Sequence, residues 1–159
     1  MEKLLELLQQ NGQAGPEAIA AQLGRPVEDV RAMIQECEES GIILGYHAVI
    51  DREKIGNAGV SALIEVRLTP ERGGGFDRLA HRIARFEQVS SCYLMSGAYD
   101  LAVIVEGNDL REVARFVSEK LSTIEGVIST ATHFQLKIYK QNGFLSKAED
   151  EVRRLPVAP

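Results

Sequence analysis

The spacing of apolar residues changes along this chain of 159 residues, and that change limits the possible folds more than any other feature. In the first third, apolar residues recur every three or four positions, as on an amphipathic helix. In residues 62–68, apolar residues alternate with a second, more polar set, which is the period of a half-buried strand. The chain is therefore predicted to combine a helical first part with a mixed second part, an α+β fold.

The first part is predicted to contain three short helices. The first covers residues 2–10. The second begins at Pro16, a good residue for a first helical turn, and stops at Gly24. The third begins at Pro26, and residues 42–50 are expected to form a strand after it. This order is the outline of a winged helix-turn-helix, although a generic three-helix bundle fits it as well.

The second part is predicted to be a ferredoxin-like βαββαβ domain, because four strand patterns and two amphipathic helices follow one another in that order. The strands are expected at residues 62–68, 89–95, 99–106 and 127–140, and the helices near 76–84 and 109–124. The predicted division is a helix-turn-helix head at 1–45, a strand and connector at 46–57, a sensor and oligomerisation domain at 58–141, and a helix-like tail at 142–159.

The two central strands of this domain are apolar on both faces. In the second strand, Cys92 and Leu94 alternate with Tyr93 and Met95, so neither face is polar. The βαββαβ order puts both helices on one face and leaves the other bare. A sheet that is apolar on both faces needs two covers, and a second copy of the chain would supply the missing one. Homodimerisation follows as a hypothesis.

Composition excludes several classes of protein. No apolar run approaches the roughly 20 residues that a membrane span requires, and the acidic, amphipathic start lacks the features of a signal peptide. Cys37 and Cys92 match no metal-ligand spacing, and we expect two thiols in a cytoplasmic protein without a cofactor. The three glycines at 73–75 lack the rest of a nucleotide-binding motif and are interpreted as a connector, and no other enzyme motif is present.

Three segments, taken together and in this order, resemble the Lrp/AsnC (feast/famine) transcription regulators. They are Glu38–Tyr46, Asp51–Gly56 and the glycine turn Ser96–Leu101. The resemblance covers roughly residues 3–141. It implies a helix-turn-helix head that binds DNA, a sensor body of the fold inferred above, dimers that often assemble into octamers, and an amino-acid effector bound between subunits near the glycine turn.

The glycine turn also has suitable chemistry for an amino acid, whose ammonium needs a carboxylate and whose carboxylate needs donors such as backbone N–H groups. The predicted effector-binding residues are Ser96, Gly97, Ala98, Tyr99 and Asp100, with Thr132 on the last strand as a weaker candidate. In this scheme Asp100 accepts from the ammonium, and Gly97 allows a positive φ and close approach. The alternative is a simple hairpin turn in which the aspartate ties its own backbone.

The third helix departs from the pattern of a DNA reader. Five of its eight exposed positions are acidic: Glu28, Asp29, Glu36, Glu38 and Glu39. Phosphate neutralisation supplies most of the affinity of such helices, so carboxylates there weaken it. The candidate DNA-binding residues are Arg25, Arg31 and Gln35, with binding expected to be weak and sensitive to salt. The alternative is a degenerate head that binds a protein partner.

One enzyme class shares this two-part architecture. Sirohaem decarboxylases have degenerate heads, and an acidic head is compatible with them. They also need histidines that contact the haem and basic residues for its carboxylates, whereas the turn here follows the regulators' glycine–tyrosine–aspartate pattern. A non-enzymatic regulator is therefore the preferred interpretation.

Overall fold

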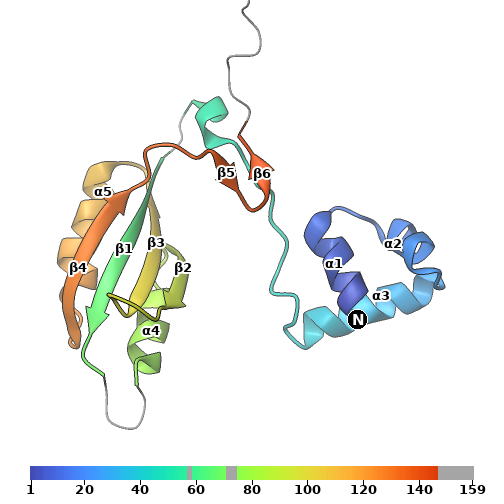
Figure 1. Cartoon of the computed structure of the whole chain (residues 1–159), viewed down its shortest axis with the longest axis horizontal. Coiled ribbons are helices and arrows are strands. Elements are labelled where there is room, and N and C mark those ends of the chain that lie inside the picture. The colour runs from blue at the N-terminus through green and yellow to red at the C-terminus, as the bar shows by residue number, and fades with distance from the viewer. Residues whose placement is uncertain (57–58, 71–74, 147–159) are drawn as a thin grey trace, which may run out of the picture. The chain divides into compact units, whose positions relative to one another are not determined.

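The two periodicities of the sequence correspond to two separate units in a computed structural model, which describes residues 1–56, 59–70 and 75–146 (Figure 1). The first unit is Met1–Val49 and the second is Ile50–Pro159. We refer to them as the head and the body. Within the described residues no helix is both long enough and apolar enough to span a bilayer.

The head consists of the three predicted helices, α1 (Glu2–Gln10), α2 (Pro16–Leu23) and α3 (Val27–Glu39). They enclose a small apolar core of Leu4, Leu8, Ile19, Ala20 and Val30. Gly24 ends α2 in the left-handed conformation (φ 64°), which a glycine adopts without the cost of a Cβ clash. This turn lets α3 start three residues later, so the prediction of a helix-turn-helix arrangement is confirmed.

The strand predicted over residues 42–50 is wrong for the single chain. Residues 44–50 are irregular, and the head contains no strand with which they could form a backbone ladder. Two contacts hold the start of the segment to α3: Ile43 N–H donates to Cys37 O (3.0 Å), and Tyr46 Oη donates to Glu38 Oε1 (3.1 Å). The alternating apolar pattern remains exposed, with Leu44 96% accessible.

The body is a βαββαβ domain, as predicted. Its elements are β1 (Val60–Leu68), α4 (Asp77–Ala84), β2 (Val89–Leu94), β3 (Leu101–Gly107), α5 (Leu110–Arg115), a π-helical continuation (Phe116–Leu121) and β4 (Val127–Phe134). The sheet order is β2-β3-β1-β4, and all neighbours are antiparallel. Asp109 caps α5 by accepting from Glu112 N–H (2.8 Å).

The core of the body lies between the sheet and its two helices, which cover the same face (Figure 1). Ile64 and Val103 point from the sheet into this core, and Leu79 and Ile83 meet them from α4; all four are at most 1% exposed. A buried side chain of this size contributes roughly 1.5–3 kcal/mol. The core therefore accounts for the alternation that first identified the strands.

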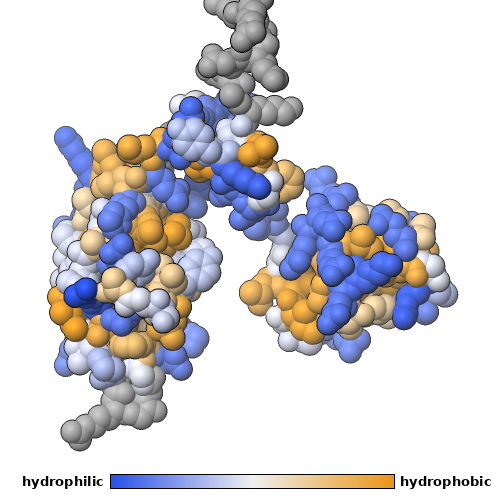
Figure 2. Space-filling model, viewed as in Figure 1, coloured by the Kyte–Doolittle hydropathy of each residue, from blue (hydrophilic) through white to orange (hydrophobic). Residues whose placement is uncertain are grey.

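The other face of the sheet carries no helix, and its side chains are mixed. The register places Leu63 and Glu65 of β1, Ala102 of β3 and His133 of β4 on it. Ala102 is only 6% exposed, whereas His133 Nε2 lies 3.3 Å from Glu65 Oε1 in a pair that remains accessible. Figure 2 shows apolar side chains gathered over the middle of this face. We call it the open face.

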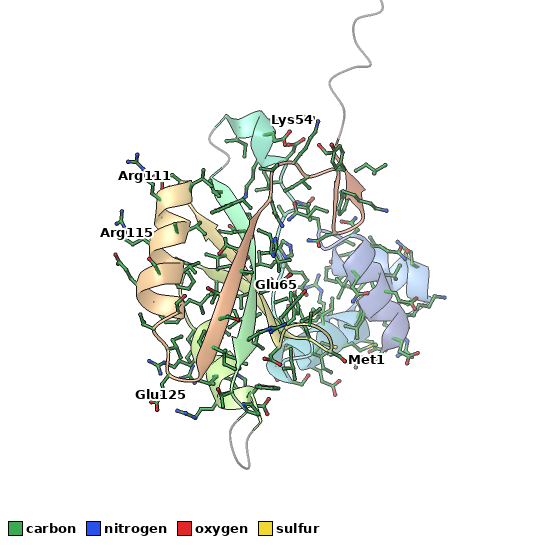
Figure 3. The ribbon with its side chains drawn as sticks, turned by 60° about the vertical axis from the view of Figure 1, so that its left-hand side comes forward. Met1, Lys54, Glu65, Arg111, Arg115 and Glu125 are labelled. Carbon is green, nitrogen blue, oxygen red and sulfur yellow. The ribbon has the colours of Figure 1, made fainter. Side chains whose placement is uncertain are left out.

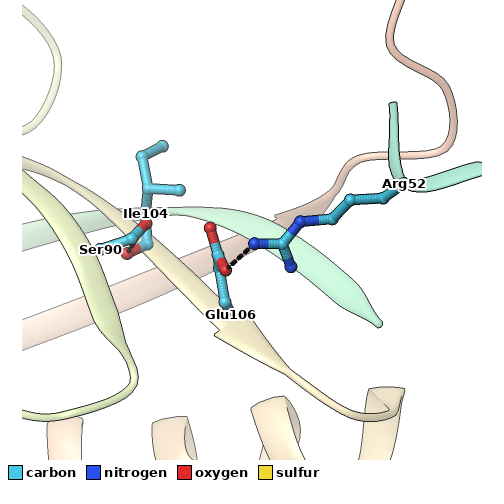
Figure 4. Close-up of polar contacts among 4 residues, drawn as sticks. All are labelled: Arg52, Ser90, Ile104 and Glu106. Atoms are coloured by element: carbon cyan, nitrogen blue, oxygen red, sulfur yellow. Dashed lines mark hydrogen bonds and ion pairs between the residues drawn. The ribbon is translucent and has the colours of Figure 1, made fainter. Parts of the chain in front are cut away.

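A short helical turn, η1 (Arg52–Ile55), enters the body and is held against β3. Arg52 Nη2 pairs with Glu106 Oε2 at 2.9 Å, and next to it Ser90 Oγ donates to Ile104 O (3.4 Å; Figure 4). Both ionised groups are largely exposed, so the pair contributes about 0–1 kcal/mol. Its role is to orient the entry of the chain rather than to stabilise it.

The last predicted strand ends earlier than expected, and the tail differs from its prediction. β4 ends at Phe134, which pairs with Ala62, and one more bond follows, from Gln135 N–H to Ser61 O (2.9 Å). Since β1 begins at Val60, it has no residues that could pair with the rest of the predicted strand up to residue 140. Residues 140–145 form a hairpin of β5 (Lys140–Gln141) and β6 (Phe144–Leu145), joined by an Asn-Gly turn. The expected helix-like tail is thus wrong for residues 142–146, and residues 147–159 lie outside the described part.

Candidate functional site

The loop between β2 and β3 folds back toward β1, and it contains the predicted glycine turn. Met95 N–H donates to Asp100 O (2.8 Å), which closes the loop on itself. Asp100 N–H then donates to Val66 O (3.0 Å), which fixes the loop to β1. In Figure 1 the loop swings from β2 across the end of the sheet. We call residues 96–100 the sensor loop.

Asp100 is part of the fold as well as a candidate ligand. Its Oδ2 accepts from Leu68 N–H at 2.7 Å, next to the end of β1. A short bond from a backbone N–H to a carboxylate is among the stronger hydrogen bonds in a protein. The aspartate therefore ties the backbone of β1 rather than that of its own turn. Its other carboxylate oxygen accepts no hydrogen bond from any residue that the structure describes.

The sensor loop exposes several backbone donors. The N–H groups of Ser96, Gly97, Ala98 and Tyr99 donate to no other group within residues 1–56, 59–70 and 75–146. The loop therefore has the backbone donors that a carboxylate requires. Gly97 does not use the positive φ that we expected of it, and a Cβ built there meets nothing within 4 Å.

Thr132 is not brought to the sensor loop within one chain. It faces the helix-covered side of the sheet, in register with Ile64 of β1, and it is half-buried there. Its neighbour along the same face, Thr130, lies with its hydroxyl 3.3 Å from that of Ser122. The five loop residues are thus contiguous in space, while the sixth predicted residue belongs to the other face.

Arg67 is a neighbour of the loop that the sequence analysis did not single out. Its Nε donates to Ala98 O at 2.9 Å, so its exposed guanidinium lies beside the sensor loop. Arg67 is 33 positions away from Asp100 in sequence, and its alternation in β1 suggested only a solvent-facing residue. The pairing register of β1 with β3 was the signal that could have located it, since Val66 pairs with Leu101 directly after the loop.

In the head, all three candidate DNA-binding side chains are exposed, and each already contacts its own chain. Arg31 pairs with Glu17 of α2, and hydrogen bonds from the backbone and from Arg31 lower the pKa of Glu17. Gln35 Nε2 donates to Glu39 Oε1 (2.7 Å). Arg25 Nη1 lies 3.9 Å from the sulfur of Met33. Surface contacts of this kind cost little to break, so DNA phosphates can compete for these groups.

A separate hollow of about 370 Å³ lies at the opposite end of β3 from the sensor loop. It is lined by Arg52, Gly59, Glu87, Gln88, Glu106, Gly107, Asn108 and Glu112. Its charged groups are engaged locally: Arg52 pairs with Glu106, and Glu112 accepts from Asn108 N–H at 2.7 Å. These bonds give the charged residues of the hollow a structural role without any ligand. Nor do any three His, Cys, Asp or Glu side chains within the described ranges form a group that could bind a metal.

Comparison with known proteins places this geometry in context. A family model described as the Lrp/AsnC ligand binding domain matches residues 61–145. The chain is 48% identical to an uncharacterized HTH-type transcriptional regulator of Bacillus subtilis (strain 168), YugG, over 99% of this chain and 95% of the relative.

Two solved structures share the fold. One is the leucine response regulatory protein LrpA of Mycobacterium tuberculosis (TM-score 0.72, 22% identity, covering 87% of this chain and 92% of that chain). The other is a transcriptional regulator of Neisseria meningitidis in complex with L-Met (TM-score 0.65, 24% identity, covering 87% of this chain and 89% of that chain).

Proposed function

This chain belongs to the Lrp/AsnC family of helix-turn-helix transcriptional regulators, and on that basis we propose that it binds DNA through α3 and an amino acid at the sensor loop, between subunits of a homodimer. The family consists of regulators that bind DNA and amino-acid effectors, not of enzymes. The enzyme alternative is therefore set aside.

The observation that carries the sensor part of the proposal is the pairing of donors and acceptor in one loop. Four consecutive backbone N–H groups donate to no described residue, and one oxygen of Asp100 accepts from none. These are the groups that the two charged ends of an amino acid need. A relative of known structure carries L-Met, which makes methionine a natural first compound to test.

The experiment for the sensor part is a thermal shift screen of the purified protein against the twenty amino acids. A ligand that binds only the folded body raises its melting temperature, by an amount that grows with concentration above the dissociation constant. We expect at least one amino acid to do so. If none changes the melting temperature at millimolar concentration, the amino-acid part of the proposal is wrong.

The DNA-binding part is supported by the helix-turn-helix geometry and by the exposure of Arg25 and Arg31. Its experiment is a fluorescence anisotropy titration with the DNA upstream of the chain's own gene at about 50 mM salt, where phosphate contacts are strong. Replacing either arginine by alanine should weaken binding and reduce the salt slope by about 1 per lost phosphate contact. The control is Lys3→Ala, which removes a cation of α1 instead.

A second candidate function is favoured by the acidity of α3. The head holds eight carboxylates against three basic side chains, and such a surface repels DNA and attracts cationic partners. In this alternative the head has lost DNA binding and contacts a basic protein surface instead. Absence of any anisotropy change with DNA at low salt, with the body still responding to an amino acid, would favour it.

The homodimer is proposed from the open face of the sheet. Leu63 and Ile104 are only half-buried there, without a helix to cover them, and exposed Tyr93 lies on the adjacent strand β2. A second copy of the same face would cover these side chains. Light scattering at micromolar concentration tests this directly: a mass of two chains is expected, and a monomer would refute it. A larger assembly such as an octamer would show as a correspondingly larger mass.

A further inference from the structure

Arg67 gives the sensor loop a charged donor that neither the loop sequence nor its backbone supplies. Its Nε donates to Ala98 O (2.9 Å), which fixes the near end of the guanidinium against the loop. The two terminal nitrogens form no hydrogen bond or ion pair with a described residue, and the side chain is exposed. A guanidinium held at one nitrogen presents the remaining pair in a fixed plane, a geometry that matches the two oxygens of a carboxylate.

The surroundings of Arg67 support an anion rather than a cation as its partner. The loop that Arg67 contacts contains the N–H groups of residues 96–99, which donate to no described residue. The carboxylate of Glu65 lies two positions earlier on the same face of β1, but it is engaged by His133 at 3.3 Å. Asp100 is turned to Leu68 N–H at 2.7 Å. The guanidinium of Arg67 therefore forms no ion pair with any described carboxylate, and it is available to an anion.

We propose that Arg67 and the backbone N–H groups of residues 96–99 form a subsite for the α-carboxylate of the effector, and that Arg67 determines selectivity for a free carboxylate. This inference rests on the proposed function and adds a residue outside the loop to its site. The ammonium, which is attached to the same α-carbon, is then left to the carboxylate of Asp100. A deaminated analogue keeps the carboxylate and should retain part of the affinity, whereas an amino-acid amide loses the charge that Arg67 recognises.

The experiment compares wild type with Arg67→Gln in thermal shift titrations against the twenty amino acids and the C-terminal amide of each amino acid that binds. Wild type is expected to bind an amino acid about 10- to 100-fold more tightly than its amide. This is the usual contribution of a hydrogen bond to a charged group, expressed as a ratio of affinities. In Arg67→Gln this ratio should fall to near one. The matched control is Arg111→Gln, since Arg111 projects from α5 and away from the sheet (Figure 3).

The ratio of the affinities for an amino acid and for its amide shows whether Arg67 contacts the carboxylate or only positions the loop. If Arg67 only holds the loop through Ala98 O, its loss weakens the amino acid and the amide by the same factor, the ratio is unchanged, and the carboxylate subsite is refuted. If wild type binds no amino acid, the proposed function fails together with this inference. If wild type binds and Arg67→Gln keeps the ratio, only this inference fails. Arg67→Lys keeps the charge without the fork, and is expected to retain an intermediate ratio; it replaces the glutamine variant if that variant does not fold.

Discussion

Asp100 is predicted to have two separable roles, and two substitutions distinguish them. Asp100→Ala removes both the acceptor of Leu68 N–H and the negative charge. Asp100→Asn removes only the charge, because the side-chain amide oxygen can still accept from the same N–H group. The comparison therefore measures the structural bond and the charge separately at one position.

The size of the effect on stability follows from the geometry. The bond from Leu68 N–H to Asp100 Oδ2 is 2.7 Å long, partly buried and made to a charged acceptor. Such a bond contributes about 1.5–3 kcal/mol, and a neutral one about 0.5–1.5 kcal/mol. Asp100→Ala should thus lower the free energy of unfolding by about 2 kcal/mol, and Asp100→Asn by about 1 kcal/mol or less. In urea, the larger change corresponds to a shift of roughly 1 M in the midpoint.

The assay combines urea denaturation of both variants with thermal shift against an amino acid that binds wild type. Asp100→Asn should lose most of its response to the amino acid while remaining nearly as stable as wild type. Two results contradict this reasoning. Equal stability of Asp100→Ala and wild type would show that the Leu68 contact is not maintained in solution, and an undiminished response of Asp100→Asn would show that the charge does not bind the ammonium.

Three further predictions concern stability and reactivity. Gly126→Ala should destabilise the body by about 2 kcal/mol or more in urea denaturation, because Gly126 has φ +97° and a Cβ there would lie 2.7 Å from Leu79 Cδ1. The control is Gly143→Ala. Gly143 also has a positive φ but has open space around it, so this substitution should destabilise the body less. The pKa of Glu17 is lowered from its ordinary value of 4.5, so its contribution to stability is present above pH 4.5 and is lost as the pH falls through the lowered pKa. The melting temperature of Glu17→Gln should therefore fall less steeply with acid than that of wild type, and parallel curves would contradict the assignment. Burial raises the pKa of the Cys92 thiol, so at pH 8 it should react with a thiol reagent more slowly in the folded protein than in urea, and equal rates would be evidence against that burial.

Local patterns predicted the helices and most of the strands, because their periodicity reports directly which residues are buried. Pro16 and Gly24 marked the ends of α2 because their own backbone preferences favour the first turn and the left-handed end of a helix. The predictions that failed concern strands that lack a neighbouring strand to pair with. Residues 42–50 alternate like a strand, but a strand also needs a neighbouring ladder, and none exists in the head. β4 likewise could not continue to residue 140, since β1 begins at Val60, only two residues beyond the partner of Phe134.

The candidate site was only half predictable for a similar reason. The loop residues are contiguous in sequence, so a short motif located Gly97 and Asp100. Arg67 reaches the loop through the pairing of β1 with β3, and no local pattern encodes that register. Thr132 stays a prediction, since within one chain it lies on the helix-covered face of the sheet. Predicting such residues requires knowing which face of each strand meets the loop.

The way the sensor loop is attached bears on how such a protein changes over evolution. Its attachments run through backbone atoms of Met95, Val66, Leu68 and Ala98 and through the side chains of Asp100 and Arg67. Residues 96, 97 and 98 are exposed, and the Ser96 hydroxyl makes no hydrogen bond in the described structure. Mutations at these positions are expected to change the free energy of unfolding very little. A lineage can therefore acquire a new effector preference there without first gaining stability elsewhere.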